Sequence, residues 1–292
     1  MKAYSLTVFL LISVSSFAQV DYQFPSLSPK GSLSQMIGTT SVKITYERPS
    51  ARKRKIFGNL VPYNQVWRTG AGNCTTISFD QEVKIEGQEI AAGTYSIFSI
   101  PNRDHWIFIL NSDTTLYGSG FYDSNKDVIR FIVPVSTSDR YYETLNFDID
   151  LIPNNAMVYL SWENTQVQFL IETMTDDKMD QFIKDELLTG KNKDSDTYAN
   201  AAEHLYFGRR NMLTAVALTE KALEINPNNG WASNVKIQLL LDMKKYEEAL
   251  DYAKSLYQRD ATRNFASEEE KKMELDFWQS LINKIETQKE QK

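Results

Sequence analysis

The sequence predicts an all-β antiparallel sandwich or jelly-roll-like domain, followed by an all-α module of tetratricopeptide-like repeats. Three observations predict this order. Apolar residues alternate with a period of two between positions 41 and 173, a helical period replaces this alternation afterwards, and a short apolar stretch precedes both. We expect a signal peptide at 1–18, the β-sandwich domain at 19–175 and the helical repeat domain at 176–292.

The first residues are typical of an export signal. Lys2 supplies a positive start, residues 6–14 are mostly apolar, and the small residues Ser16 and Ala18 stand at the −3 and −1 positions before Gln19. No later apolar stretch is long enough to span a bilayer. We therefore expect a periplasmic or secreted protein that has no membrane span.

The β region consists of short runs rich in β-branched and aromatic residues, which favours about nine strands. Turn residues that bound these runs predict hairpin connections at 86–88, 102–104, 153–155 and 164–165. No helical pattern interrupts the runs, so an antiparallel sandwich or barrel is expected. The alternation does not give the order of the strands.

The helical region contains a repeat. Ala215 recurs as Ala249 after 34 residues, the period of the tetratricopeptide motif, and Ala222 and Pro227 stand at late positions of the same motif. Small residues let paired helices approach closely, and the proline ends the second helix. We expect a leading helix at 176–189, repeats at 196–229 and 230–263, and a capping helix at 267–288.

The composition excludes several classes of function. The formal net charge is −6, so a nucleic-acid partner is not expected. Two histidines, His105 and His204, are too few for a His-rich zinc site. Cys74 is the only cysteine, so no intramolecular disulfide is possible, and we expect this thiol to be buried. No cofactor is predicted.

A run of ordered motifs resembles a known bacterial family. The motifs are YERP at 46–49, IFGNLVPY at 56–63, VWRTGA at 66–71 and AGTYSIF at 92–98. Over about residues 28–172 the chain resembles the family catalogued as domain of unknown function 2911. The resemblance implies an exported β domain, often with additional C-terminal helices, and no particular reaction. Family members usually carry Gly where Lys53 stands and an acidic residue where Asn73 stands, so that carboxylate is absent here.

The candidate ligand-binding residues are Arg48, Trp67, Arg68 and Thr69. An arginine between an aromatic residue and a glycine-rich turn can offer several donors to a carboxylate, a phosphate or a sugar hydroxyl. The structural alternative is a buried Arg68 that ties loop carbonyls to a carboxylate such as Glu143, with Trp67 in the core.

A weaker candidate is a calcium loop. Asp123, Asn125 and Asp127 place oxygen ligands at positions 1, 3 and 5 of such a loop. The glycine expected at position 6 is Val128, and the glutamate expected at position 12 is Pro134. An ordinary polar turn is therefore the favoured interpretation.

No complete catalytic set is present, and the leading hypothesis is a non-enzymatic binding module. Its β domain would hold a small or carbohydrate-like ligand, and its helices would bind a protein partner. One alternative is a hydrolase or isomerase in which Arg68 acts as electrophile and Glu143 or Asp123 acts as base. A second alternative is a pure assembly scaffold.

Overall fold

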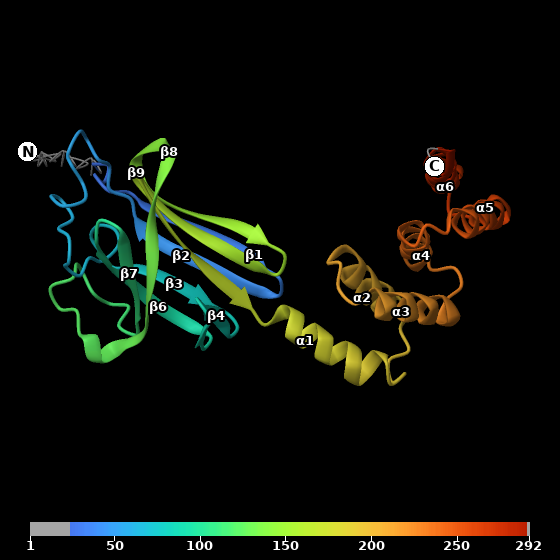
Figure 1. Cartoon of the computed structure of the whole chain (residues 1–292), viewed down its shortest axis with the longest axis horizontal. Coiled ribbons are helices and arrows are strands. Elements are labelled where there is room, and N and C mark those ends of the chain that lie inside the picture. The colour runs from blue at the N-terminus through green and yellow to red at the C-terminus, as the bar shows by residue number, and fades with distance from the viewer. Residues whose placement is uncertain (1–23, 291–292) are drawn as a thin grey trace, which may run out of the picture.

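The computed structural model describes residues 24–290, so the predicted signal peptide at 1–18 lies outside the described residues. A β domain forms one end of an elongated molecule and a row of helices forms the other (Figure 1). The predicted order, an antiparallel β domain followed by a helical module, is confirmed.

Within the described residues the strands form one nine-stranded sheet in the order β1-β2-β3-β6-β7-β8-β9-β4-β5, and every pair is antiparallel. The strands are β1 (Lys30–Ile37), β2 (Thr40–Glu47), β3 (Thr75–Phe79), β4 (Val83–Ile85), β5 (Gln88–Ile90), β6 (Gly93–Pro101), β7 (His105–Asn111), β8 (Asp127–Ile152) and β9 (Asn155–Thr173). Most neighbours are consecutive in sequence. The β4–β5 hairpin departs from this order: it pairs with β9 at the far edge, and β3 pairs with β6 instead.

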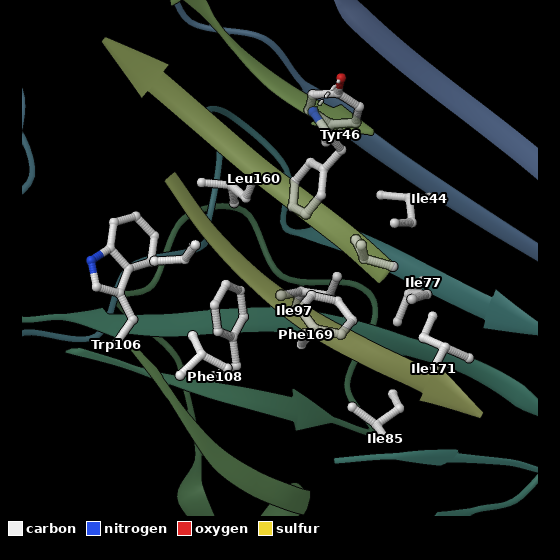
Figure 2. Packing of buried hydrophobic residues seen from close by; sticks show 14 of the residues in the cluster. Ile44, Tyr46, Ile77, Ile85, Ile97, Trp106, Phe108, Leu160, Phe169 and Ile171 are labelled. Carbon is white, nitrogen blue, oxygen red and sulfur yellow. Dashed lines mark hydrogen bonds between the residues drawn. The ribbon is translucent and has the colours of Figure 1, made fainter. Parts of the chain in front are cut away.

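Strand β8 belongs to both halves of the sheet. Residues 127–134 pair with β7, and residues 135–152 pair with β9. The sheet therefore folds over at β8, and its two halves enclose the main core, as Figure 2 shows for residues of β2, β3, β6, β7 and β9. The alternating apolar positions of the sequence supply this core because successive side chains of a strand point to opposite faces.

The predicted turns at 86–88, 102–104 and 153–155 connect β4–β5, β6–β7 and β8–β9. The predicted connection at Asn164 and Thr165 is wrong, because both residues lie inside β9. At this point Glu163 has a φ of 52°, and the pairing with β8 shifts register. The turn-like residues therefore mark an irregularity within one long strand rather than a hairpin.

The helical module follows β9 directly. Its elements are α1 (Thr175–Phe182), the π-helical turn η2 (Ile183–Leu187), α2 (Ser195–Phe207), α3 (Met212–Ile225), α4 (Gly230–Asp242), α5 (Tyr246–Thr262) and α6 (Glu268–Glu290). Asp194, Asn211 and Asn229 accept hydrogen bonds from the first turns of α2, α3 and α4, as N-cap residues do. The described helices include none that is long and apolar enough to cross a membrane.

Two helical hairpins form the centre of this module. The buried small residues Ala202, Ala215 and Ala222 let α2 and α3 pack closely, and Ala249 and Ala253 have the same place in α5. Pro227 follows the end of α3 at Ile225, as a helix-terminating proline does. Helix α2 begins one residue before the expected first repeat and α3 lies within it, and α4 and α5 lie within the second.

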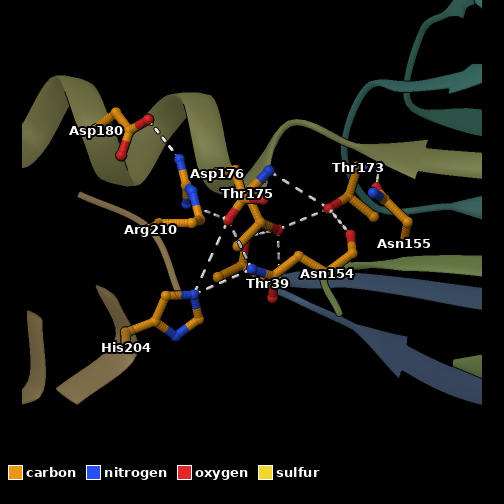
Figure 3. Close-up of polar contacts among 9 residues, drawn as sticks. All are labelled: Thr39, Asn154, Asn155, Thr173, Thr175, Asp176, Asp180, His204 and Arg210. Carbon is orange, nitrogen blue, oxygen red and sulfur yellow. Dashed lines mark hydrogen bonds and ion pairs between the residues drawn. The ribbon is translucent and has the colours of Figure 1, made fainter. Parts of the chain in front are cut away.

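The two parts of the chain meet at a polar junction (Figure 3). The Asp176 carboxylate accepts a hydrogen bond from Asn154 in the β8–β9 turn at 2.7 Å and pairs with Arg210 after α2 at 2.6 Å. Thr39, in the β1–β2 turn, donates its backbone N–H to the Thr175 hydroxyl at 3.0 Å. Gly38 permits this contact, because a Cβ there would lie 2.2 Å from that hydroxyl oxygen.

Candidate functional site

A long loop at the end of the β domain away from the helices carries the predicted ligand-binding residues. This loop connects β2 to β3, and it is fixed to β6 where Trp67 and Ser99 exchange backbone hydrogen bonds of 2.8 and 2.9 Å. The Thr69 side chain is fully buried and donates to the Ser99 hydroxyl at 2.9 Å. Thr69 has a φ of 55°, so the chain turns sharply there.

The loop encloses a cavity of about 240 Å³ against the sandwich, here called the Arg68 cavity. It is lined by Ser28, Pro49, Arg54, Leu60, Val61, Trp67, Arg68, Gly70, Ala71 and Trp162. Two of the four predicted ligand-binding residues, Trp67 and Arg68, therefore line one cavity. The lining also includes Trp162 of β9, which is distant from the loop in sequence.

Two tryptophans form the floor of the Arg68 cavity. The rings of Trp67 and Trp162 stack with centroids 6.0 Å apart and an interplanar angle of 20°. The indole N–H of Trp67 donates to the Gly70 carbonyl at 3.1 Å, and that of Trp162 donates to the Glu143 carbonyl at 3.4 Å. Since both polar atoms are satisfied within the protein, the indoles offer the cavity an apolar surface in a fixed orientation.

The guanidinium of Arg68 lacks the partners that a structural role requires. Its Nε is buried, and it is the one buried side-chain nitrogen or oxygen of the described residues that has no hydrogen-bond partner. Among residues 24–290 Arg68 forms no ion pair, so the predicted tie to Glu143 is not made. A buried donor left unsatisfied costs about 1–3 kcal/mol, so an unpaired Arg68 is expensive to retain.

A second guanidinium lines the same cavity. Arg54 donates to the backbone carbonyls of Ala51 at 3.0 Å and Ser50 at 2.7 Å, and its charge has no carboxylate partner among the described residues. None of the residues that line the cavity is acidic. The sequence already contains this asymmetry, because residues 48–79 include six basic residues and no Asp or Glu. A scan of local charge would have added Arg54 to the candidates.

Arg48, in contrast, has a structural role. It donates to the Leu145 carbonyl at 3.2 Å and to the Asn146 side chain at 3.0 Å, and it lies over the Tyr46 ring. These contacts fix the end of β2 to β8. Arg48 is absent from the lining of the Arg68 cavity.

The two carboxylates considered as bases lie outside the Arg68 cavity. The Glu143 carboxylate accepts from the backbone N–H of Arg52 at 2.7 Å and is close to the Tyr141 hydroxyl. Asp123 accepts from the backbone N–H of Asn125 and caps the short 3₁₀ helix η1 (Ser124–Lys126). Both carboxylates therefore hold loops in place.

The acidic turn after β7 is held together by its own side chains. Asp127 accepts hydrogen bonds from Asn111 at 2.8 Å and Tyr122 at 2.6 Å, and it pairs with Arg130 at 2.7 Å. Burial, together with the bond to Asp127, raises the pKa of Tyr122 to about 12. Within the described part of the chain no group of His, Cys, Asp or Glu residues is placed to hold a metal ion.

The remaining sequence expectations concern single side chains. Burial of Cys74 is confirmed, and its Sγ lies 3.1 Å from the Ser96 hydroxyl. Asp148 and Asp150 are exposed on β8, as the alternation of that strand predicts. The Nε2 of His204 lies 3.0 Å from the Asn154 side-chain nitrogen, so this histidine belongs to the junction.

A larger cavity of about 750 Å³ lies at this junction. One face of α2 lines it, together with the β8–β9 turn; the residues are Pro153, Asn154, Asp176, Asn200, Glu203, His204, Phe207, Gly208 and Arg210. The sequence did not indicate this cavity, because its two walls come from elements that are far apart along the chain.

Taken together, the fold defines an antiparallel β domain whose loops enclose a cationic, tryptophan-lined cavity and whose last strand continues into a helical module. Residues 28–171, which span the β domain from before β1 into β9, match the family described as "Protein of unknown function (DUF2911)". No curated protein and no solved structure matches the chain.

Proposed function

We propose that the chain is an exported, non-enzymatic binding protein whose β domain holds a small anionic ligand in the Arg68 cavity. The observation that carries this proposal is the buried, unpartnered Nε of Arg68. A carboxylate or phosphate beside Arg68 and Arg54 would supply the missing acceptor, since guanidinium groups prefer bidentate oxyanions.

The size and the floor of the cavity restrict the ligand further. A volume of about 240 Å³ fits a body the size of a monosaccharide. The indoles of Trp67 and Trp162 favour a ring that can lie against an aromatic face. The absence of acidic residues among the described lining residues favours binding over acid–base catalysis. A sugar acid or a sugar phosphate therefore has the expected chemistry.

The test compares thermal shifts with galacturonate, inorganic phosphate and uncharged glucose. At a hundred times its dissociation constant a bound anion adds about 2.7 kcal/mol to the stability of the wild type, whereas glucose adds little. We expect Arg68→Met to abolish the anion-induced shift. Because this change also removes a buried unpaired donor, it should raise the melting temperature of the ligand-free chain.

Arg48→Met is the matched control. It should lower the melting temperature, since Arg48 links β2 to β8, and it should leave the anion-induced shift intact. An Arg68→Met chain that melts earlier than the wild type would assign Arg68 a structural role and remove the basis of the proposal.

A second candidate function is peptide binding by the helices, which we propose to be tetratricopeptide-like repeats. It is favoured by the exposed face of α2, where Asn200, Glu203 and Phe207 line the junction cavity and Phe207 is 66% exposed. Stacked helix pairs of such repeats create an extended concave binding surface.

We expect Phe207→Ser to weaken the binding of the full-length chain to an array of extended peptides about tenfold, because it removes an aromatic side chain that a bound peptide would cover. Leu213→Ser, an apolar position at the start of α3 that is 81% exposed, is the control and should have no effect. Equal losses in both variants would show nonspecific hydrophobic adsorption.

A further inference from the structure

The most exposed large apolar side chains of the β domain gather at one end. Four of them are more than 70% exposed, namely Phe24, Leu27, Tyr117 and Phe121. All four belong to two segments beside the Arg68 cavity, the chain before β1 and the loop between β7 and β8. Single exposed apolar residues are common, but such a gathering on loops at one end marks an interaction surface.

Printed contacts place both segments beside the loop at 48–74. The Leu27 carbonyl accepts a hydrogen bond from Arg52 at 2.7 Å, and the neighbouring Ser28 lines the cavity. On the other side Tyr117 forms a β-bridge with Asn73. The next residue, Gly118, lies beside the Arg68 guanidinium, because a Cβ added at Gly118 would be 3.5 Å from an Nη of Arg68. The apolar side chains therefore flank the basic loop from two directions.

The loop that presents Tyr117 and Phe121 is anchored at its base. Lys126 pairs with Asp113 at 2.7 Å, and this bond, with hydrogen bonds from Thr115, lowers the pKa of Asp113 to about 2. The network of Tyr122, Asp127 and Arg130 holds the other end. The loop is thus folded, and its two aromatic side chains nevertheless face outward.

The basic loop between β2 and β3 contains no acidic residue of its own. Residues 48–79 carry six basic and no acidic side chains, in a chain whose net charge is −6. Lys53 and Lys55 are exposed, and among the described residues neither has an ion-pair partner. This segment of an acidic protein is therefore positively charged, and exposed apolar side chains flank it.

We propose that this end of the β domain docks on an anionic lipid surface. Exposed Phe, Tyr and Leu side chains would enter the boundary between headgroups and acyl chains, and lysines beside them would be attracted to lipid phosphates. This proposal stands apart from the small ligand of the Arg68 cavity, because Tyr117, Phe121, Lys53 and Lys55 do not line that cavity.

The experiment is co-sedimentation of the full chain with vesicles. Vesicles of phosphatidylcholine containing phosphatidylglycerol should bind the wild type, and vesicles of phosphatidylcholine alone should bind it at least tenfold less. Phe121→Ser should weaken binding to the anionic vesicles about tenfold, since it removes one inserted aromatic ring. Lys53→Gln together with Lys55→Gln should weaken it by a further order of magnitude, because each basic residue near the surface contributes about fivefold.

Matched controls come from the opposite end of the chain. Leu213→Ser changes an apolar residue that is 81% exposed on α3, and Lys244→Gln with Lys272→Gln changes two exposed lysines of the helical module. Lys244 has a φ of 61°, close to the 60° of Lys53, so the two substitutions meet the same backbone constraint. These controls should bind vesicles as the wild type does.

Three outcomes would overturn the proposal. The first is equal sedimentation with neutral and anionic vesicles. The second is loss of binding in the helical controls. The third is binding to soluble polygalacturonate as tight as binding to vesicles and insensitive to Phe121→Ser, which would identify an acidic polysaccharide as the partner. The small-ligand proposal is tested by thermal shifts with galacturonate or phosphate, and the lipid proposal is tested by sedimentation with vesicles. Failure of one proposal is therefore distinguished from failure of the other.

Discussion

Asp260→Ala is expected to destabilise the helical module by about 3–5 kcal/mol, because it breaks a buried ion pair and leaves its partners unpaired. Asp260 of α5 is completely buried, accepts two hydrogen bonds from Arg259 at 2.8 and 2.9 Å, and accepts a third from the Trp278 indole of α6 at 2.9 Å. Urea unfolding followed by circular dichroism at 222 nm measures the loss. Asp251→Ala, an exposed position on α5, is the control and should change stability by less than about 0.5 kcal/mol.

The lowered pKa of Asp260 predicts how the stability of the helical module depends on pH. Burial raises the pKa of Asp260, but the hydrogen bonds from Arg259 and Trp278 and the charges of Arg259 and Arg263 outweigh burial and hold the pKa below its usual value. A carboxyl whose pKa is lower in the folded than in the unfolded state stabilises the fold above about pH 4, and this contribution is lost as the pH falls through the folded pKa. Asp260→Asn should therefore flatten the acid limb of the stability curve. An unchanged acid limb would contradict the assignment.

Phe108→Ala is expected to destabilise the β domain by about 3–5 kcal/mol, since it leaves a cavity where the two halves of the sheet meet. The Phe108 ring of β7 is fully buried. Its centroid lies 5.6 Å from the ring centroid of Phe131 of β8 and 5.4 Å from that of Phe169 of β9. A thermal melt of the β domain, followed by tryptophan fluorescence, should shift down by about 10 °C. Phe121→Ser, which alters an exposed ring of the same domain, should leave this melt unchanged, and comparable shifts in the two variants would contradict the assigned packing.

The sequence predicted the elements whose signals are local. The alternation of apolar residues predicted the β domain, and the period of 34 residues predicted the positions of α2 to α5. Strand β1 was missed, because at the edge of the sheet its residues are half-exposed and polar, and its alternation is weak. Strand β9 was read as two strands joined at 164–165, because an irregularity interrupts the apolar alternation without ending the strand.

Only part of the candidate site was predicted, because sequence signals are local and the site combines residues that are distant along the chain. Trp67 and Arg68 were found because they stand together in one motif, and they line one cavity. Trp162 was missed as a lining residue, because only the pairing of β9 with the rest of the sheet brings it to the loop. Thr69 and Arg48 are close to the site in sequence, but both have structural roles. Thr69 donates a hydrogen bond to Ser99, and Arg48 donates one to Asn146 of β8.

The place of the β4–β5 hairpin has a consequence for how the chain folds. These strands precede β6 in the sequence, yet they pair with β9, where Val83 lies opposite Thr173. During synthesis from the N-terminus, β1, β2, β3, β6 and β7 can pair in succession. The β4–β5 hairpin cannot pair with the sheet until β9 has been made. Until β9 arrives, Val83 and Ile85, which are completely buried in the finished fold, remain exposed along an unpaired edge. Closure of the sheet is therefore a late, long-range step, and the growing chain is most prone to aggregate just before it.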